Sequence, residues 1–263
     1  MALSPLANRY RSTVQDLEDV FSDKQYFLAR LRIEFAYLAI LTQRKGYNTE
    51  DVNRKLCWAM QLDKDEINIG YEEFCSMDKI TQHDVKALEY FVNSRIAKDG
   101  QDGPAIINLI HCGLTSQDIN SLAFTWMLSN AIKFVASEWN TFATAVSKFI
   151  EKVNVVAMGY THGQPAIPVA IGQEYYKLYR KIATTFTRIQ NVKLTAKFAS
   201  STGNYSTLLV IFGSIQEIQK MQRELLKMLG VEFHFTDNPR QIDDYTSYVD
   251  VLQLIQQLAL NLK

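Results

Sequence analysis

Apolar residues recur at helical spacing along most of the chain, and few prolines or glycines interrupt them. The clearest repeat follows Ser22-Asp-Lys-Gln25, a capping box that marks a helix start, and continues to about Gln43. Two further boxes, Thr115-Ser-Gln-Asp118 and Ser214-Ile-Gln-Glu217, also precede apolar repeats. The pattern predicts helices over residues 22–43, 50–60, 84–97, 115–153, 169–199, 214–230 and 246–263.

Two of the predicted helices, 115–153 and 169–199, would be far longer than the usual length of about 11–12 residues. Helices this long without glycine breaks are typical of a bundle, often one that subunits share. The chain is therefore predicted to be all-α. We expect an N-terminal helical domain over residues 1–114, followed over residues 115–263 by the first long helices of an incomplete, oligomeric central bundle.

The last predicted helix carries a sustained apolar stripe from Tyr248 to Leu262 and then stops without a C-cap glycine or a proline. This pattern favours a long bundle helix that the end of the chain interrupts. The alternative is a natural C-terminal helix that docks and frays.

The two long helices are separated by Tyr160-Thr-His-Gly-Gln-Pro-Ala-Ile-Pro168. No regular helix can run through this segment, because Pro165 and Pro168 lack an amide hydrogen and push the preceding residues toward extended geometry. Gly163 permits a sharp turn. We expect a rigid polar kink between two helices, which is a suitable place to hold the imidazole of His162 for proton transfer.

The composition narrows the possible functions. Lys+Arg and Asp+Glu both number 28, and the resulting net charge of zero argues against a nucleic-acid binder that works by bulk electrostatics. No apolar run approaches the length of a membrane span, and the N-terminus lacks the regions of a signal peptide. The three cysteines have no metal-ligand spacing, which indicates reduced thiols and no metal site. We expect a cytoplasmic protein without nucleic-acid or membrane partners.

Three of the four histidines, His83, His111 and His162, lie in polar motifs that contain glycine or hydroxyl residues. The fourth, His234, alternates with phenylalanines, which indicates a structural residue. Each motif alone has a simpler interpretation. His83 could mark only a helix start, and Thr115 could be no more than a cap.

Together these motifs resemble the adenylosuccinate lyases, a family of the fumarase/aspartase superfamily. The combination of Thr-His-Gly-Gln-Pro-Ala, His-Asp-Val and Thr-Ser-x-Asp is specific. Argininosuccinate lyases carry other residues around the corresponding histidine, and fumarases and aspartases lack the His-Asp-Val segment in this form. The matching stretches span almost the whole chain: Ser4–Tyr10, Gln82–Phe91, His111–Asp118, Thr161–Ala166, Gly203–Tyr205 and Gln241–Asp243.

The resemblance implies a carbon–nitrogen lyase of purine nucleotide biosynthesis that needs no cofactor. It would eliminate fumarate from adenylosuccinate, giving AMP, and from the succinyl-aminoimidazole-carboxamide ribotide. By its match to the family motif, His162 would be the general acid that protonates the leaving nitrogen. His83 would contribute to catalysis by positioning the substrate near the leaving group together with Asp84, and His111 and Gln241 would add polar contacts.

The substrate implied by the resemblance carries a phosphate and two carboxylates, so its site needs several fixed donors. Arg9 and Tyr10 would hold the phosphate, a task that suits a bidentate guanidinium. Thr115 and Ser116, at a predicted helix start, would bind a succinyl carboxylate through hydroxyl and backbone N–H groups. The resemblance also implies a homotetramer around a bundle of long central helices.

One family segment is absent from the 263 residues. Family members carry Gly-Ser-Ser-x-Met-Pro-x-Lys-x-Asn-Pro, whose serine is the general base, and a glutamate beyond it that orients the acid histidine. The only Gly-Ser of this chain, Gly213-Ser214, continues as Ile-Gln-Glu. We therefore expect a truncated adenylosuccinate lyase with little or no activity alone. Two alternatives stay open: a short paralogue that serves as a binding or assembly module, and another fumarate-forming lyase of the superfamily.

Overall fold

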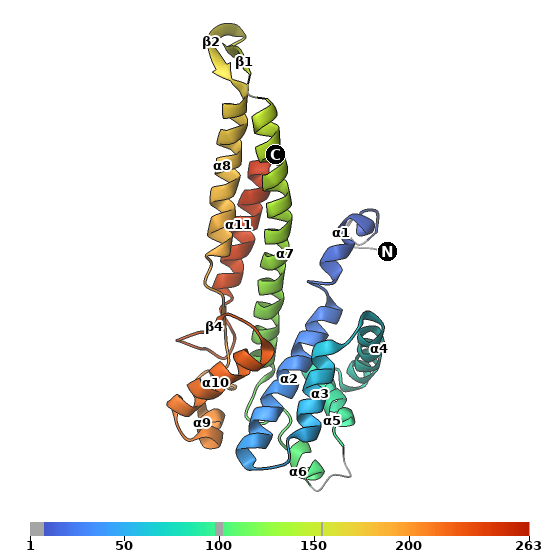
Figure 1. Cartoon of the computed structure of the whole chain (residues 1–263). Coiled ribbons are helices and arrows are strands. Elements are labelled where there is room, and N and C mark those ends of the chain that lie inside the picture. The colour runs from blue at the N-terminus through green and yellow to red at the C-terminus, as the bar shows by residue number, and fades with distance from the viewer. Residues whose placement is uncertain (1–7, 98–101, 154, 263) are drawn as a thin grey trace. The chain divides into compact units, whose positions relative to one another are not determined.

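Helices dominate the structure, a computed structural model that describes residues 8–97, 102–153 and 155–262 (Figure 1). The all-α prediction is confirmed, with four short strands added to it. By contacts the chain forms two compact units, which we describe separately. Unit 1 comprises Met1–Ser129 and Leu194–Asp244, and unit 2 comprises Asn130–Lys193 and Tyr245–Lys263. The domain boundary expected at residues 114–115 stays a prediction, and the contacts divide the chain elsewhere.

Unit 1 is a cluster of helices around α2 (Asp23–Lys45), whose side chains from Phe27 to Thr42 are nearly all buried. A helix that is apolar on all sides is stable only inside a core. The Ser22 hydroxyl accepts from the Gln25 N–H at 3.3 Å, and Gly46 ends the helix at a φ of 75°, so the predicted helix is confirmed. Besides the first part of α7, the other helices that the described residues form in unit 1 are α1 (Arg11–Glu18), α3 (Glu50–Gln61), α4 (Lys64–Thr81), α5 (Asp84–Arg95), α6 (Gly103–Ile107), α9 (Ser206–Phe212) and α10 (Ile215–Leu229).

Helix α4 was not predicted, although its start has a sequence signature. Asp63 and Glu66 form a reciprocal capping box, in which each side chain accepts the other residue's backbone N–H. The predicted helix after Ser214 is confirmed as α10, which Gly230 ends in the left-handed conformation. Residues 98–101 lie outside the described residues, and Gly103 and Pro104 begin α6.

The two long helices were predicted with different success. Helix α7 (Ser116–Lys152) has 37 residues and confirms the first. Helix α8 (Ile171–Gln190) is shorter at both ends than the expected 169–199. Beyond it the chain is extended, because β3 (Thr195–Ala196) pairs in parallel with β4 (His234–Phe235) in unit 1. The backbone of residues 194–196 thus bonds to a distant segment instead of continuing the helix.

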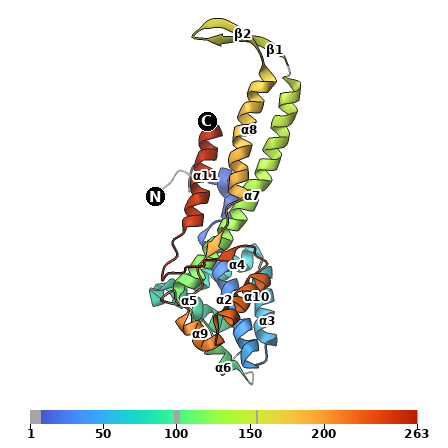
Figure 2. The same cartoon turned by 90° about the vertical axis from the view of Figure 1, so that its left-hand side faces the viewer.

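Unit 2 consists of the second part of α7, the strands β1 (Val156–Thr161) and β2 (Gln164–Ala170), α8, and α11 (Thr246–Leu262). The antiparallel hairpin of β1 and β2 projects from the ends of α7 and α8, and α11 runs beside α8 (Figures 1 and 2). Trp139 of α7 stacks on Phe186 of α8 with ring centroids 5.0 Å apart.

The apolar stripe expected along α11 is only partly buried, since Val251 is covered while Leu252 and Leu262 are 51% and 55% exposed. Among the described residues, no helix combines the length and apolar character that crossing a membrane requires.

Candidate functional site

The N-terminus of α5 holds two predicted site residues side by side. His83 is the N-cap of the helix, and its Nδ1 accepts the Lys86 backbone N–H at 3.2 Å. In a neutral ring an accepting Nδ1 leaves the hydrogen on Nε2, at the other edge of the imidazole. The side chain is 55% exposed. His83 is therefore both a helix cap and a ring that can offer Nε2–H to a ligand.

Asp84 is fixed by an arginine that the sequence analysis did not single out. Nη1 of Arg30, on the buried helix α2, lies 2.5 Å from Oδ2 of Asp84, and its guanidinium lies 4.0 Å from the ring centroid of Tyr26. Burial alone would raise the pKa of Asp84, but the hydrogen bond and the charge of Arg30 outweigh it and lower this pKa. The available sequence signal was a charged residue among the apolar residues of this helix.

The turn before α7 is attached to α2 by two side chains. Nδ1 of His111 lies 2.5 Å from Oε1 of Glu34, and the Tyr37 hydroxyl donates to the Cys112 carbonyl at 2.9 Å. His111 has a φ of 55°, which is uncommon for a residue with a side chain. Burial would lower the pKa of His111, but the charge of Glu34 and its hydrogen bond outweigh it, so this pKa is raised.

Thr115 and Ser116 begin α7 above a buried ionic network. One carboxylate oxygen of Asp118 accepts the Thr115 N–H at 2.9 Å, and the other accepts the Ala199 N–H at 2.8 Å. The second oxygen also lies 2.6 Å from Nζ of Lys197, and both charged side chains are fully buried. Because Asp118 holds the first turn of α7, the half-buried Thr115 and Ser116 side chains start from a fixed backbone.

The segments that contain Gly203 and Gln241 are neighbours in unit 1. Gly203 has a φ of 74°, and a Cβ on it would lie 2.5 Å from the carbonyl carbon of Arg240. Only glycine allows this approach of two backbones. The hydroxyl of Ser121 donates to Asp243, which ties the same segment to α7. Gln241 itself is exposed.

Arg9 and Tyr10 form an exposed pair at the start of α1. The guanidinium carbon of Arg9 lies 5.4 Å from the centre of the Tyr10 ring. Tyr10 is the N-cap residue of the helix, and its carbonyl accepts the Thr13 N–H at 3.0 Å. Both side chains can therefore reach a ligand from the surface of unit 1.

His162 lies at the tip of the β1–β2 hairpin, in unit 2. The expected polar kink between two helices is thus a β-hairpin, and this part of the prediction was wrong. His162 and Gly163 have φ values of 52° and 75°, and Thr161 pairs with Gln164 across them. A two-residue turn with both φ values positive has the twist that antiparallel strands require. The His162 side chain is exposed.

Eight of the nine predicted residues therefore belong to unit 1, and His162 belongs to unit 2. In unit 1 they are held by groups that the sequence analysis missed, above all Arg30, Glu34 and Lys197. The arrangement supplies imidazole, guanidinium, hydroxyl and backbone N–H groups, which suit an anionic ligand. Among the described residues, no cluster of three or more His, Cys, Asp or Glu could hold a metal ion.

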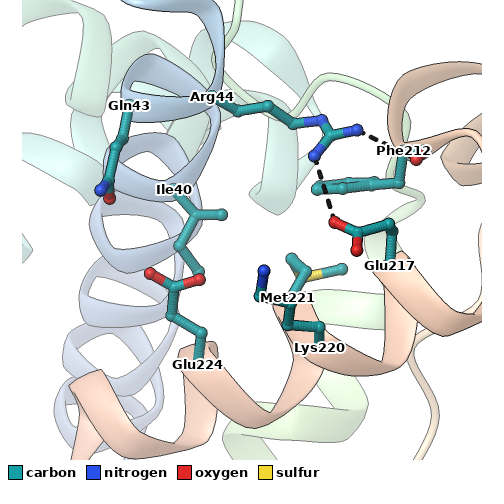
Figure 3. A pocket seen from close by; sticks show the side chains of 8 residues that line it. All are labelled: Ile40, Gln43, Arg44, Phe212, Glu217, Lys220, Met221 and Glu224. Atoms are coloured by element: carbon teal, nitrogen blue, oxygen red, sulfur yellow. Dashed lines mark hydrogen bonds and ion pairs between the residues drawn. The ribbon is translucent and has the colours of Figure 1, made fainter.

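A separate cavity of about 190 Å³ lies between α2, α9 and α10 and contains none of the predicted residues (Figure 3). Arg44 bridges its upper side, where its Nη2 donates to the Phe212 carbonyl at 3.0 Å and its Nη1 lies 3.5 Å from Glu217. These contacts satisfy the C-terminal carbonyls of α9 and connect it to α2. The cavity is thus a joint between helices of unit 1.

Over residues 8–263 the sequence matches the model of one protein family, which is described as a lyase. The chain belongs to this lyase family.

Curated relatives are adenylosuccinate lyases. The chain is 30% identical to the adenylosuccinate lyase of Buchnera aphidicola subsp. Baizongia pistaciae over 99% of its own length and 57% of the relative's. It is 28% identical to the enzyme of Haemophilus influenzae over 95% of its length and 56% of that protein's. The chain thus spans a little over half the length of these relatives.

A solved structure of similar fold is the fumarate lyase from Mesorhizobium sp. BNC1, with a TM-score of 0.72 and 17% identity over 94% of this chain and 55% of that one. Another is the 3-carboxy-cis,cis-muconate lactonizing enzyme from Pseudomonas putida, with a TM-score of 0.69 and 18% identity over 93% of this chain and 53% of that one. At these identities the likeness concerns the fold.

Proposed function

We propose that this chain is the part of an adenylosuccinate lyase that binds adenylosuccinate and supplies the acid of the elimination. The observation that carries the proposal is the match to adenylosuccinate lyases over nearly the whole chain, at 30% identity. The succinyl-aminoimidazole-carboxamide ribotide, which has the same succinyl-amine group, is the second proposed substrate. A protein of small-molecule metabolism without membrane or nucleic-acid partners fits the cytoplasm.

The proposed chemistry is removal of a proton from carbon beside a carboxylate and expulsion of the purine amine as fumarate forms. His162 would protonate the departing nitrogen, because an imidazole titrates near neutral pH. The exposed turn that carries it supports this role, since the ring is accessible to a ligand. His83 and Asp84 would position the substrate near the leaving group, with the Nε2–H of His83 free to donate and Asp84 held in place by Arg30.

Anion binding is proposed for the remaining predicted residues. Thr115 and Ser116 would bind a succinyl carboxylate, a role supported by their place in the first turn of α7, where helix N–H groups favour negative charge. Arg9 and Tyr10 would hold the phosphate. Gln241 would add a polar contact from the segment that is tied to Gly203 by close backbone packing.

Self-association is the proposed assembly, and unit 2 offers the surface for it. Every buried residue of α7 precedes residue 129, whereas Phe142 and Phe149 of its second part are 37% and 43% exposed. Apolar side chains of this size are seldom left in water when they form a patch. In size-exclusion chromatography with light scattering we expect the chain to elute as an oligomer. The resemblance to adenylosuccinate lyases implies that this oligomer is a tetramer.

Binding of adenylosuccinate by the chain tests the proposed function, because binding does not require the general base. Isothermal titration calorimetry should detect the binding of adenylosuccinate to the chain. The double change Thr115→Val and Ser116→Ala should weaken it by about 1.5–3 kcal/mol, roughly 10- to 150-fold, through loss of hydrogen bonds to a charged group. Thr144→Val is the matched control, since the Thr144 hydroxyl is exposed on the same helix and donates to its own helix at 2.8 Å.

Two results would contradict the proposal. One is the absence of adenylosuccinate binding at millimolar concentration in a folded chain. The other is turnover or preferential binding of a different fumarate-forming substrate, which would indicate another lyase of the superfamily. Cleavage is followed by the ultraviolet absorbance change of the purine, and we expect little of it from the chain by itself.

A further inference from the structure

The pair formed by Glu34 and His111 is unusual because of where its charge lies. Glu34 is 1% exposed in the middle of the largely buried helix α2, and one of its oxygens lies 2.5 Å from Nδ1 of His111. Its other oxygen, Oε2, is buried without a hydrogen-bond partner among the described residues. An ionised carboxylate can only accept, so Nδ1 of His111 carries the hydrogen and donates it.

Such a carboxylate is a poor device for stability alone. A buried charge loses its hydration, and a well-packed apolar pair of similar size is often as stable or more stable. Here the cost extends to the backbone, since His111 is held at a φ of 55°. The turn is already attached by the Tyr37 hydroxyl at Cys112 and by the Thr207 hydroxyl, which donates to the Gly113 carbonyl at 2.7 Å. The ion pair is therefore not needed as an anchor.

The charges around His111 act in one direction. Glu34 faces it from α2, Glu89 from α5 and Asp118 from α7, and each of the three raises its pKa, against the lowering effect of burial. The charge of Asp118 is shared with Lys197, whose Nζ lies 2.6 Å away. Glu34 is the only one of the three in contact with the ring, so it dominates the raising contributions.

We propose that Glu34 is a positioning residue, which fixes the His111 imidazole as a cation with Nδ1–H toward α2 and Nε2–H available to a carboxylate bound beside Thr115 and Ser116. The turn that contains His111 leads directly into the first residues of α7, so the His111 cation and the hydroxyl groups of Thr115 and Ser116 belong to one binding segment. The inference rests on the proposed function and extends it, by adding a fixed positive charge to the carboxylate site and assigning its support to Glu34.

The first measurement concerns the ring itself and needs no ligand. In ¹⁵N-histidine NMR of the whole chain, His111 should stay protonated at both nitrogens at pH 7, above the usual midpoint of about 6.5. Glu34→Gln keeps the shape and an acceptor but removes the charge, so the His111 midpoint should fall. Glu89→Gln is the matched control, because this carboxylate acts on His111 without contacting it, and the midpoint should move far less.

The second measurement uses fumarate as the probe. Titration of fumarate at pH 7 should shift the Nε2 resonance of His111, and Glu34→Gln should weaken the affinity roughly 10- to 100-fold, whereas Glu89→Gln should leave it within about twofold. Affinity of the wild-type chain should fall as pH rises through the His111 midpoint, since the cation is lost. In Glu34→Gln the same fall should occur at lower pH.

Several outcomes overturn the inference. If His111 of the wild-type chain is neutral at pH 7, the inference is overturned without any variant, even if Glu34→Gln fails to fold. Equal midpoints in the wild-type chain and Glu34→Gln remove the role of Glu34, and fumarate that leaves His111 unchanged removes the carboxylate contact. If fumarate shifts His111 as expected but adenylosuccinate does not bind, the proposed function fails and the positioning role stands.

Discussion

The buried ion pair of Lys197 and Asp118 gives the sharpest prediction for stability. We consider Lys197→Met, which keeps the length of the side chain and removes its charge. Both charged side chains are fully buried and their charged atoms lie 2.6 Å apart. Nζ of Lys197 also donates to the Ser200 carbonyl. In the variant Asp118 keeps two backbone N–H donors, those of Thr115 and Ala199, but has no cation.

The expected cost follows from that geometry. Removal of one partner from a buried pair costs about 3–5 kcal/mol, because the remaining charge is uncompensated. This is a large part of a typical total of about 5–15 kcal/mol. The two remaining N–H donors place the value for Lys197→Met toward the lower end. With a urea slope of about 3 kcal/mol/M, the unfolding midpoint should fall by about 1 M.

Urea unfolding followed by both circular dichroism and tryptophan fluorescence tests this expectation, and agreement of the two probes supports two-state analysis. Lys227→Met, at an exposed position of α10, is the control and should change the free energy of unfolding by less than about 0.5 kcal/mol. If Lys197→Met shifts the midpoint no more than this control does, the pair does not hold the start of α7 as we argue.

Three further predictions follow from single contacts. Gly46→Ala and Gly203→Ala both place a side chain at positive φ, but only the new Cβ at residue 203 would meet a backbone atom, at 2.5 Å. In thermal unfolding, Gly203→Ala should therefore lose about 1–3 kcal/mol more free energy of unfolding than Gly46→Ala. Equal losses would contradict the close approach. Arg30→Met should raise the pKa of Asp84 toward the ordinary value of about 4, measured by ¹³C NMR of the carboxyl group. In the wild-type chain the contribution of Asp84 to stability is present above that pH and is lost as the pH falls through the lowered pKa. Glu34→Gln should flatten the pH dependence of the free energy of unfolding. In the wild-type chain the raised pKa of His111 contributes stability that is complete below about pH 6.5 and is lost as the pH rises, by up to about 1.4 kcal/mol per pH unit. A slope that survives the change would refute this assignment.

The helices that the sequence predicted well are those with local signals at their ends. Ser22 and Gly46 bound α2, and Ser214 and Gly230 bound α10, because a cap bonds only to its own helix and can be read within a few residues. The absence of glycine breaks likewise gave the length of α7. Helix α4 shows that the same signal, the box of Asp63 and Glu66, can be present and overlooked.

The extended segments were missed because their partners are distant or their turn signal was read differently. Residues 194–200 look like a continuation of α8, yet the backbone of residues 194–196 bonds to residues 234–236. Lys197 and the Ala199 N–H bond to Asp118 of α7. In the hairpin, Pro165 and Pro168 excluded a helix correctly, but His162 and Gly163 form a strand-pairing turn. The prolines and Gly163 indicated a sharp turn in the sequence, but not that the residues on either side of it pair as strands.

The sequence by itself determined the helical class, the caps, and the motifs whose combination matches the lyase family, since each of these is a local pattern of residue types. Only the tertiary structure decided that Arg30 and Glu34, two charges on an apolar helix, are buried, and that they hold Asp84 and His111, which lie 54 and 77 residues away along the chain. The reason is physical: hydrogen bonding and capping within a helix depend on neighbours in sequence, whereas burial of a charge and the pKa of its partner depend on which distant surfaces the folded chain brings into contact.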